Sequence, residues 1–157
     1  MLPVDSIFSG ANLFVLPFWT LMIFFPRWDW TKRIMGSFIP FALLSLVYLV
    51  LFVASLTPET AQMLANPTLK DVAAVFAKPP VAATGWVHFL VMDLFVGRWI
   101  YWEGQRTDTW TVHSLALCLF AGPMGLFSHI LTAAIAARRE ANAASDPPGP
   151  PPTASEG

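Results

Sequence analysis

The sequence predicts an all-α, polytopic membrane protein with four transmembrane helices and a short interfacial helix between the second and the third. Hydrophobic residues make up 55% of the 157 residues and charged residues 12%, and the mean hydropathy is +0.57. This balance is typical of chains that cross the bilayer several times. Four apolar segments, each long enough to span the hydrocarbon core, are separated by shorter polar stretches. They cover residues 7–25, 34–56, 81–102 and 110–136.

The first two segments are expected to be membrane helices. Residues 7–25 contain Asn12 and Pro17, which a membrane helix tolerates when neighbouring groups satisfy the freed backbone atoms. Residues 34–56 are followed by Thr57-Pro58. Because threonine is a good N-cap and proline suits the first helical position, this pair predicts the start of a new short segment.

Between the second and third spans, residues 69–76 repeat apolar side chains at i, i+3, i+4 and i+7. This spacing predicts a short helix that lies on the membrane surface. In residues 110–136, small and polar side chains share one helical face, and we expect that face to meet the other helices. Gly122-Pro123 should bend or loosen this fourth span. The residues on the shared face are Ser114, Cys118, Gly122, Gly125, His129 and Thr132.

We expect one membrane domain, residues 1–140, followed by a tail, residues 141–157. The tail is rich in Pro and Ala and cannot bury a core, which predicts disorder. The chain starts without a basic signal-peptide region, so we expect no cleavage. A net charge of −1 without a basic patch argues against a nucleic-acid partner. The single Cys118 excludes a disulfide within the chain.

The third span is unusual because it carries three ionisable residues, His88, Asp93 and Arg98. A charged group near the middle of a membrane helix costs roughly 2.5–3.5 kcal/mol, so it normally faces other helices or a wet cavity. The three residues fan around the helix, which means that other helices must complete any site. Trp86 and Gly97 share the face of Asp93, and Gly97 leaves room for a neighbouring helix or a flat ligand.

Depth along the spans groups the candidate residues. With spans three and four antiparallel, His88 and His129 are expected at one level, together with Asn12. Arg98 and His113 form a second level near the tryptophan-rich turns, and Asp93 lies between the levels, opposite Cys118 and Gly122. We interpret this pattern as a polar seam through the bundle. The alternative is structural: Asp93 and the histidines make interhelical hydrogen bonds, and Arg98 extends to the interface.

The membrane orientation is not determined by charge in a four-span arrangement. The tryptophan-rich side carries Arg27, Lys32, Arg33 and Arg106, and the opposite side carries Lys70, Lys78, Arg138 and Arg139. The positive-inside count is therefore equal on the two sides. We favour cytoplasmic tight turns after spans one and three, because their charges lie closest to the span ends.

Several stretches resemble the abscisic-acid-deficient-four-like family. The stretches are residues 17–32, 57–59, 86–95 and 113–129, and they include the patterns His88-x4-Asp93 and Pro123-x-Gly125-x3-His129. The similarity covers about residues 8–136, and the stretches follow one another in the same order as in the family. This family includes a plastid membrane protein that plants need to make neoxanthin. The absence of a transit peptide predicts a bacterial inner-membrane member.

The resemblance implies an apolar isoprenoid ligand such as a carotenoid and an acid–base isomerisation of the neoxanthin-forming type. In that reaction Asp93 is the candidate base, His88 or His129 the acid, and Arg98 an electrostatic support. The residues expected to contact the substrate are Asn12, Trp86, Gly97, His113, Cys118 and Gly122. No cofactor or metal is required. The alternatives are a non-enzymatic membrane binding or structural subunit and, as one version of it, a haem-binding bundle in which His88 and His129 are the ligands. The partners expected are the lipid bilayer and the apolar ligand, and the sequence is also compatible with an oligomer.

Overall fold

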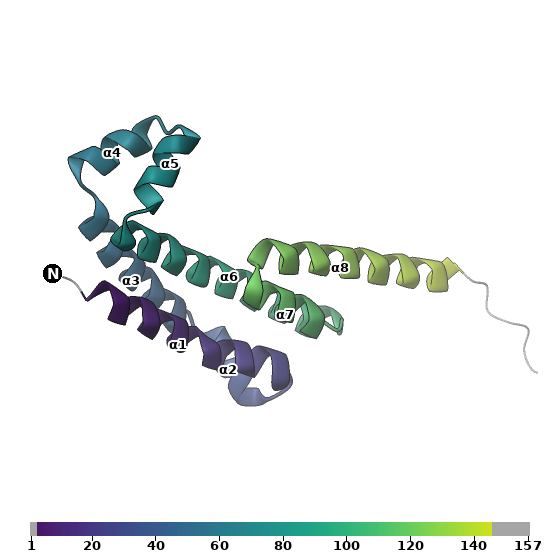
Figure 1. Cartoon of the computed structure of the whole chain (residues 1–157). Helices are drawn as coiled ribbons and strands as arrows, with labels where there is room; N and C mark the ends of the chain where they lie inside the picture. Colours follow the sequence, from purple (N-terminus) through teal and green to yellow (C-terminus); the bar gives the residue numbers. More distant parts are fainter. Residues whose placement is uncertain (1–2, 146–157) are drawn as a thin grey trace, which may run out of the picture.

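The computed structural model describes residues 3–145, and this range forms eight α-helices joined by short turns (Figure 1). The all-α prediction is therefore confirmed. In chain order the helices are α1 (Val4–Phe24), α2 (Asp29–Gly36), α3 (Ile39–Ser55), α4 (Pro58–Ala65), α5 (Leu69–Phe76), α6 (Pro79–Thr107), α7 (Val112–Phe120) and α8 (Gly122–Ser145).

Two of these helices, α1 and α6, are long and apolar enough to cross a membrane. The pair α2 and α3 qualifies together as a third span, bent by 43° at the break between them. Within residues 3–145 the structure thus contains two or three candidate spans. The prediction of four spans is not confirmed.

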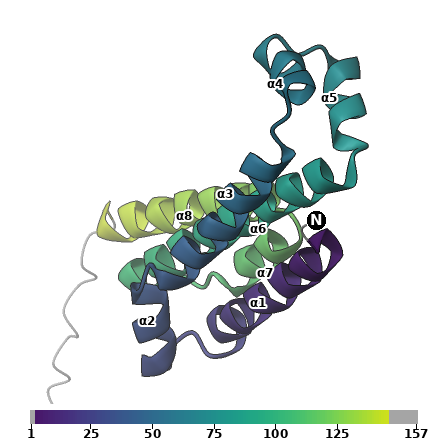
Figure 2. The ribbon, with the colours of Figure 1, turned by 90° about the vertical axis from the view of Figure 1, so that its left-hand side faces the viewer.

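Helix α6 is the centre of the bundle, and α1, α3, α7 and α8 all pack against it (Figure 2). Helices α1 and α6 run in the same direction, because Asn12 contacts Trp86 near their starts and the Tyr101 hydroxyl donates to Pro26 O (2.9 Å) near their ends. Helix α3 runs the opposite way and hydrogen-bonds α6 through Ser55 and Thr84. The long α6 supplies the buried core residues Val87, Leu94, Ile100 and Tyr101.

The predicted second span is broken at Ser37. Its backbone N–H donates to Ile34 O (3.1 Å), which ends α2, and its side-chain oxygen accepts from Ile39 N (3.2 Å) at the start of α3. Pro40 in the first turn of α3 has no N–H to continue an earlier helix. The free carbonyl of Met35 is satisfied by α6, because Arg98 Nε (2.6 Å) and Trp102 Nε1 (3.2 Å) both donate to it.

The segment between α3 and α6 forms two short helices rather than one. Thr57 caps α4 by accepting from Thr60 N, and Thr68 caps α5 by accepting from Asp71 N, both at 3.2 Å. The Asp71 carboxylate accepts in return from Thr68, which lowers the pKa of this exposed carboxyl. The start at Pro58 and the helix over residues 69–76 are confirmed. Together α4 and α5 form an arm that stands away from the bundle (Figure 1).

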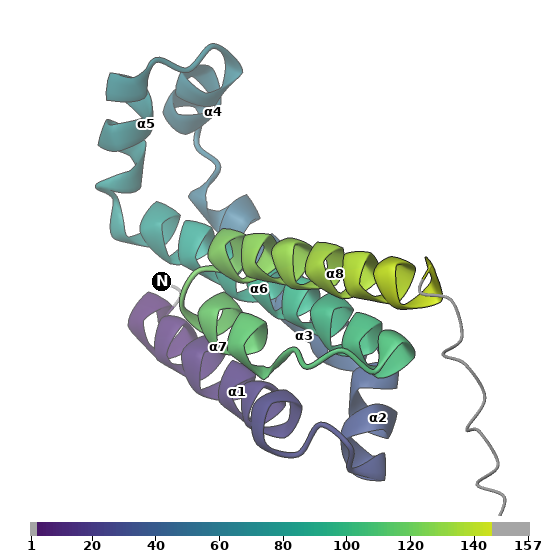
Figure 3. The same ribbon diagram turned by 90° about the vertical axis from the view of Figure 1, so that its right-hand side faces the viewer.

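The predicted fourth span is wrong, because the chain reverses at Ala121 and α7 and α8 form an antiparallel hairpin (Figure 3). Ser114 Oγ lies 3.0 Å from Ser128 Oγ, and His113 Nε2 lies 2.9 Å from Thr132 Oγ1. Ala121 is extended (φ −159°, ψ 98°). Pro123 lacks the N–H of a continuous helix and its ring would clash with the preceding turn, so the Gly-Pro pair reverses the chain rather than bending it.

Helix α8 continues to Ser145. Residues 141–145 are therefore helical, although their composition predicts the beginning of a disordered tail. The rest of that predicted tail, residues 146–157, lies outside the described residues. Helix α8 extends past the first residues of α7 and away from the bundle (Figure 1).

Candidate functional site

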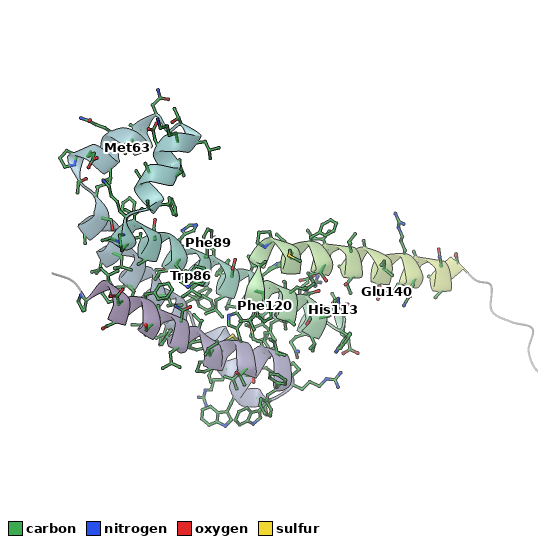
Figure 4. The ribbon with its side chains drawn as sticks, in the orientation of Figure 1. Met63, Trp86, Phe89, His113, Phe120 and Glu140 are labelled. Atoms are coloured by element: carbon green, nitrogen blue, oxygen red, sulfur yellow. The ribbon has the colours of Figure 1, made fainter. Side chains whose placement is uncertain are left out.

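A groove of about 290 Å³ lies between α1, α6 and α7. Its lining is apolar except for the Asn12 amide, the Trp86 indole N–H and the Asp93 carboxylate, all three of which belong to residues predicted to form the site. The lining residues are Asn12, Leu13, Val15, Leu16, Trp19, Trp86, Leu90, Asp93 and Leu119. Figure 4 labels Trp86, which lies on the side of α6 that faces α1.

A hydrogen bond between α1 and α6 fixes one side of this groove. Asn12 Oδ1 accepts from Trp86 Nε1 (2.9 Å), while Asn12 Nδ2 donates to Phe8 O (2.8 Å) one turn earlier in its own helix. The Phe8 ring packs against the indole at 5.8 Å. Both polar ends of Asn12 are therefore engaged, and the Trp86 ring is held in one orientation. The prediction that Asn12 reaches the level of the early part of span three is confirmed.

Asp93 lies against the first residue of α8. A Cβ atom added to Gly122 would be only 2.0 Å from Asp93 Oδ1, so this approach requires glycine. The preceding residue, Ala121, has no side-chain oxygen to cap α8, and its carbonyl already accepts from Met124 and Gly125. The carboxylate from α6 faces the N-terminus of α8 instead, where the partial positive charge of the helix favours an anion.

Cys118 and Gly125 form the tight contact behind Asp93. The Cys118 thiol donates to the backbone oxygen of Asp93 (3.4 Å), and its own side chain is fully buried. A Cβ on Gly125 would lie 2.3 Å from Cys118 Cβ. Cys118 and Gly122 thus reach Asp93 from the hairpin side, and neither is among the groove-lining residues.

The space beside Gly97 is occupied by a neighbouring helix. The indole of Trp19 lies where a Cβ on Gly97 would be, with the nearest ring atom 2.5 Å from that position. Of the two occupants that the sequence allowed, a helix or a flat ligand, the structure has the helix. Trp19 also forms part of the groove wall. The sequence analysis missed this residue, although its spacing of seven from Asn12 places both on one face of α1.

His88 and Arg98 lie on the other side of α6, toward α3. The His88 ring packs at 5.6 Å from Tyr48, and the Arg98 guanidinium lies 4.4 Å from the centre of the Phe38 ring. Arg98 also donates to Met35 O. It therefore supports the break between α2 and α3, and its partners there are a carbonyl and aromatic rings rather than Asp93.

His113 and His129 lie at the α7–α8 hairpin. The His129 ring packs against Trp99, with the ring centres 5.1 Å apart. Trp99 is eleven positions after His88 on α6, which corresponds to about 16 Å along the helix axis. The prediction that His88 and His129 are level is wrong, because the hairpin makes α8 run parallel to α6. Two axial ligands of one haem must face each other across the same iron, so this pair does not fit the haem alternative.

A protein-family model described as ABA DEFICIENT 4-like matches residues 6–129. The chain belongs to this family. It is also 38% identical over 136 residues to Protein ABA DEFICIENT 4, chloroplastic, of Arabidopsis thaliana, covering 83% of the present chain. The chain spans 62% of the length of that relative. No solved structure matches.

The ABA DEFICIENT 4-like segment contains the whole groove and most of the hairpin contacts. It begins just before Asn12 and ends at His129, so all ten residues predicted for the site fall inside it. The structure divides these ten into three groups. The first group lies at the groove, which Asn12, Trp86 and Asp93 line and around which Gly97, Cys118 and Gly122 pack. The second group, His88 and Arg98, faces α3 and α2. The third group, His113 and His129, lies in the hairpin.

Proposed function

We propose that this protein binds the end group of a carotenoid-like isoprenoid in the Asp93 groove and isomerises it by acid–base chemistry. The observation that carries the proposal is a single carboxylate lining a mostly apolar groove of the helix bundle, where the Asn12 amide and the Trp86 indole are already hydrogen-bonded to each other. Membership of the ABA DEFICIENT 4-like family supports an isoprenoid of the carotenoid class.

The size and surroundings of the groove suit one end of such a ligand. A volume of about 290 Å³ is at the lower limit of small-molecule pockets, so the groove holds a ring and a short part of a polyene. Leu13 is 70% exposed and Leu16 is 49% exposed, and both line the groove. The groove therefore opens to the bundle surface, where the rest of a rod-like ligand would lie among lipid chains.

The proposed reaction converts an epoxy end group into an allenic one. The epoxide C–O bond breaks, its oxygen gains a proton and becomes a hydroxyl, and the adjacent polyene carbon loses a proton as the allene forms. No atoms or electrons are gained or lost overall. One carboxyl group suffices if Asp93 removes the proton from carbon and returns it to oxygen. His88, His129 and Arg98, the candidate acids and electrostatic support, are not needed in this version because they lie outside the groove.

The test uses a host that makes epoxy-xanthophylls. Expression of the full chain should produce a new pigment isomer on chromatography, and Asp93→Asn should abolish it, because the amide keeps the shape but cannot accept the proton. Asp108→Asn serves as the matched control, since Asp108 is exposed in the turn after α6 and its left-handed backbone (φ 50°) also suits asparagine. A new isomer that persists in Asp93→Asn would contradict the assigned role of Asp93.

A binding role without chemistry is the second candidate, and the position of Asp93 at the N-terminus of α8 favours it. In this version the carboxylate stabilises the hairpin, and the groove holds a pigment that is released unchanged. The absorption spectrum of the purified protein distinguishes the two. A three-peaked polyene band with unaltered extracted pigment indicates binding alone, whereas a colourless protein and an unchanged pigment profile in the host contradict both.

A further inference from the structure

His129 is almost completely buried, at 1% exposed, and neither of its ring nitrogens has a hydrogen-bond partner among the described residues. His113 Nδ1 is also buried and unpartnered. A neutral imidazole presents one N–H donor and one acceptor. Leaving a buried polar atom unsatisfied costs roughly 1–3 kcal/mol, so such atoms in native proteins are normally satisfied by a ligand or by ordered water.

Three helices bring polar side chains to the region of His129 and His113, although the Trp99 ring packs against His129 itself. Helix α7 supplies His113 and Ser114, and α8 supplies Ser128 and Thr132, which are already paired across the hairpin. Helix α6 supplies Glu103, which lies one turn after Trp99, and Trp99 packs against the His129 ring (5.1 Å). Glu103 is itself bound by Arg106 at the end of α6. The junction of α6, α7 and α8 is therefore a polar region that continues to a charged pair at the tryptophan-rich end of the bundle.

The ligand must be small and able both to donate and to accept a hydrogen bond. A metal ion needs more ligands, and no group of three or more suitable side chains occurs in the part of the chain that the structure describes. Water satisfies both requirements, and buried waters typically bridge about three polar groups that lack other partners.

We propose that water enters the junction of α6, α7 and α8 from the Glu103 end and binds between His129 and His113, which makes the junction a buried proton-exchange site. This site is separate from the Asp93 groove and does not depend on the proposed reaction. Water at His129 exchanges protons with the imidazole, and Glu103 beside Arg106 is the charged group at the entrance. Ionisable residues in membrane bundles commonly line such wet regions.

The direct test is nuclear magnetic resonance of the full chain, labelled with ¹⁵N at histidine and leucine, in detergent micelles. The chain has three histidines, so each ring is assigned by replacing one histidine at a time. We expect magnetisation transfer from water to the rings of His129 and His113. The reference is the backbone N–H of Leu115, which is buried in the same hairpin and bound to Thr111 O (2.9 Å). A His129 ring that exchanges no faster than this amide would overturn the proposal.

A matched pair of variants locates the water. His129→Phe keeps a ring of similar shape but removes both nitrogens, so it should abolish water transfer to His113 Nδ1. His88→Phe changes a histidine that packs on Tyr48, on another side of α6, and should leave that transfer unchanged. Transfer to His113 that survives in His129→Phe would show that the two histidines do not share a water. If His129→Phe fails to fold, the wild-type exchange measurement still decides the proposal.

Discussion

At the scale of single residues, Asp93 has an environment that offsets its cost in a membrane helix. One side of the carboxylate lines the groove, and the other faces the N-terminus of α8 through Gly122. The same contact explains why the two glycines of the hairpin cannot be larger, since Gly122 faces Asp93 and Gly125 faces Cys118. The sequence indicated small residues at these positions, but only the reversal of the chain shows what they touch.

Gly122→Ala should destabilise the protein. The added Cβ would lie 2.0 Å from Asp93 Oδ1, so the carboxylate or α8 must move. We expect a loss of about 1–3 kcal/mol, typical of overpacking, measured as a lower melting temperature in detergent. Gly10→Ala is the matched control, because apart from the backbone of its own helix and its chain neighbours no atom lies within 4 Å of its added Cβ. It should be neutral or gain up to about 1 kcal/mol from helix propensity.

A double variant identifies the source of this loss. In an Asp93→Ala background the nearest clashing atoms are gone, so the additional cost of Gly122→Ala should be smaller than in the wild type. An equal cost in both backgrounds would show that Gly122 is required for a reason other than its contact with Asp93.

At the scale of helices, the sequence predicted what depends on local signals and failed where two segments meet. Thr57 and Thr68 cap α4 and α5 through hydrogen bonds within three residues, which the sequence pattern makes visible. The helices α1 and α6 were predicted from the length of their apolar segments, which is also a local signal. The hairpin depends on contacts such as Ser114 with Ser128, fourteen residues apart. In one continuous helix these two residues would also share a face. The spacing of the small and polar residues therefore does not distinguish a straight span from a reversal of the chain.

A disulfide tests the hairpin directly. The Ser114 and Ser128 side-chain oxygens are 3.0 Å apart, so cysteines at both positions should form a disulfide on mild oxidation. In one continuous helix the two positions would be about 21 Å apart along the axis and could not be joined. The experiment uses a Cys118→Ala background, and Ser114→Cys with Ser145→Cys is the negative control. Absence of the Ser114–Ser128 cross-link while the protein remains folded would restore the straight fourth span.

At the scale of the whole molecule, the hairpin changes which end of the bundle the C-terminal part of α8 lies at. Helix α8 starts beside Asp93 and runs parallel to α6, with His129 against Trp99. Arg138 is sixteen residues after Gly122, about 24 Å along the axis, whereas α6 ends about 21 Å beyond Asp93. Arg138 and Arg139 therefore lie on the tryptophan-rich side, not with Lys70 and Lys78. The sequence placed them incorrectly because it assumed four full crossings.

This correction also removes the tie in the charge count. The tryptophan-rich side now carries six basic residues, Arg27, Lys32, Arg33, Arg106, Arg138 and Arg139, and the opposite side carries Lys70 and Lys78. For a bundle that crosses a bacterial inner membrane, loops rich in Lys and Arg remain in the cytoplasm, so the corrected count predicts a cytoplasmic tryptophan-rich side. The arm formed by α4 and α5 would then lie on the other face of the membrane.

Single cysteines in a Cys118→Ala background test this topology with a membrane-impermeant thiol reagent on intact cells. We expect Lys70→Cys to be labelled from outside, and Asp108→Cys and Arg139→Cys to be labelled only after the membrane is opened. The comparison of Arg139→Cys with Asp108→Cys holds for either orientation, because the hairpin requires both on one side. If Arg139→Cys instead follows Lys70→Cys, α7 and α8 cross the membrane together as a fourth span, and the contacts of Asp93 with Gly122 and of His129 with Trp99 would both have to be abandoned.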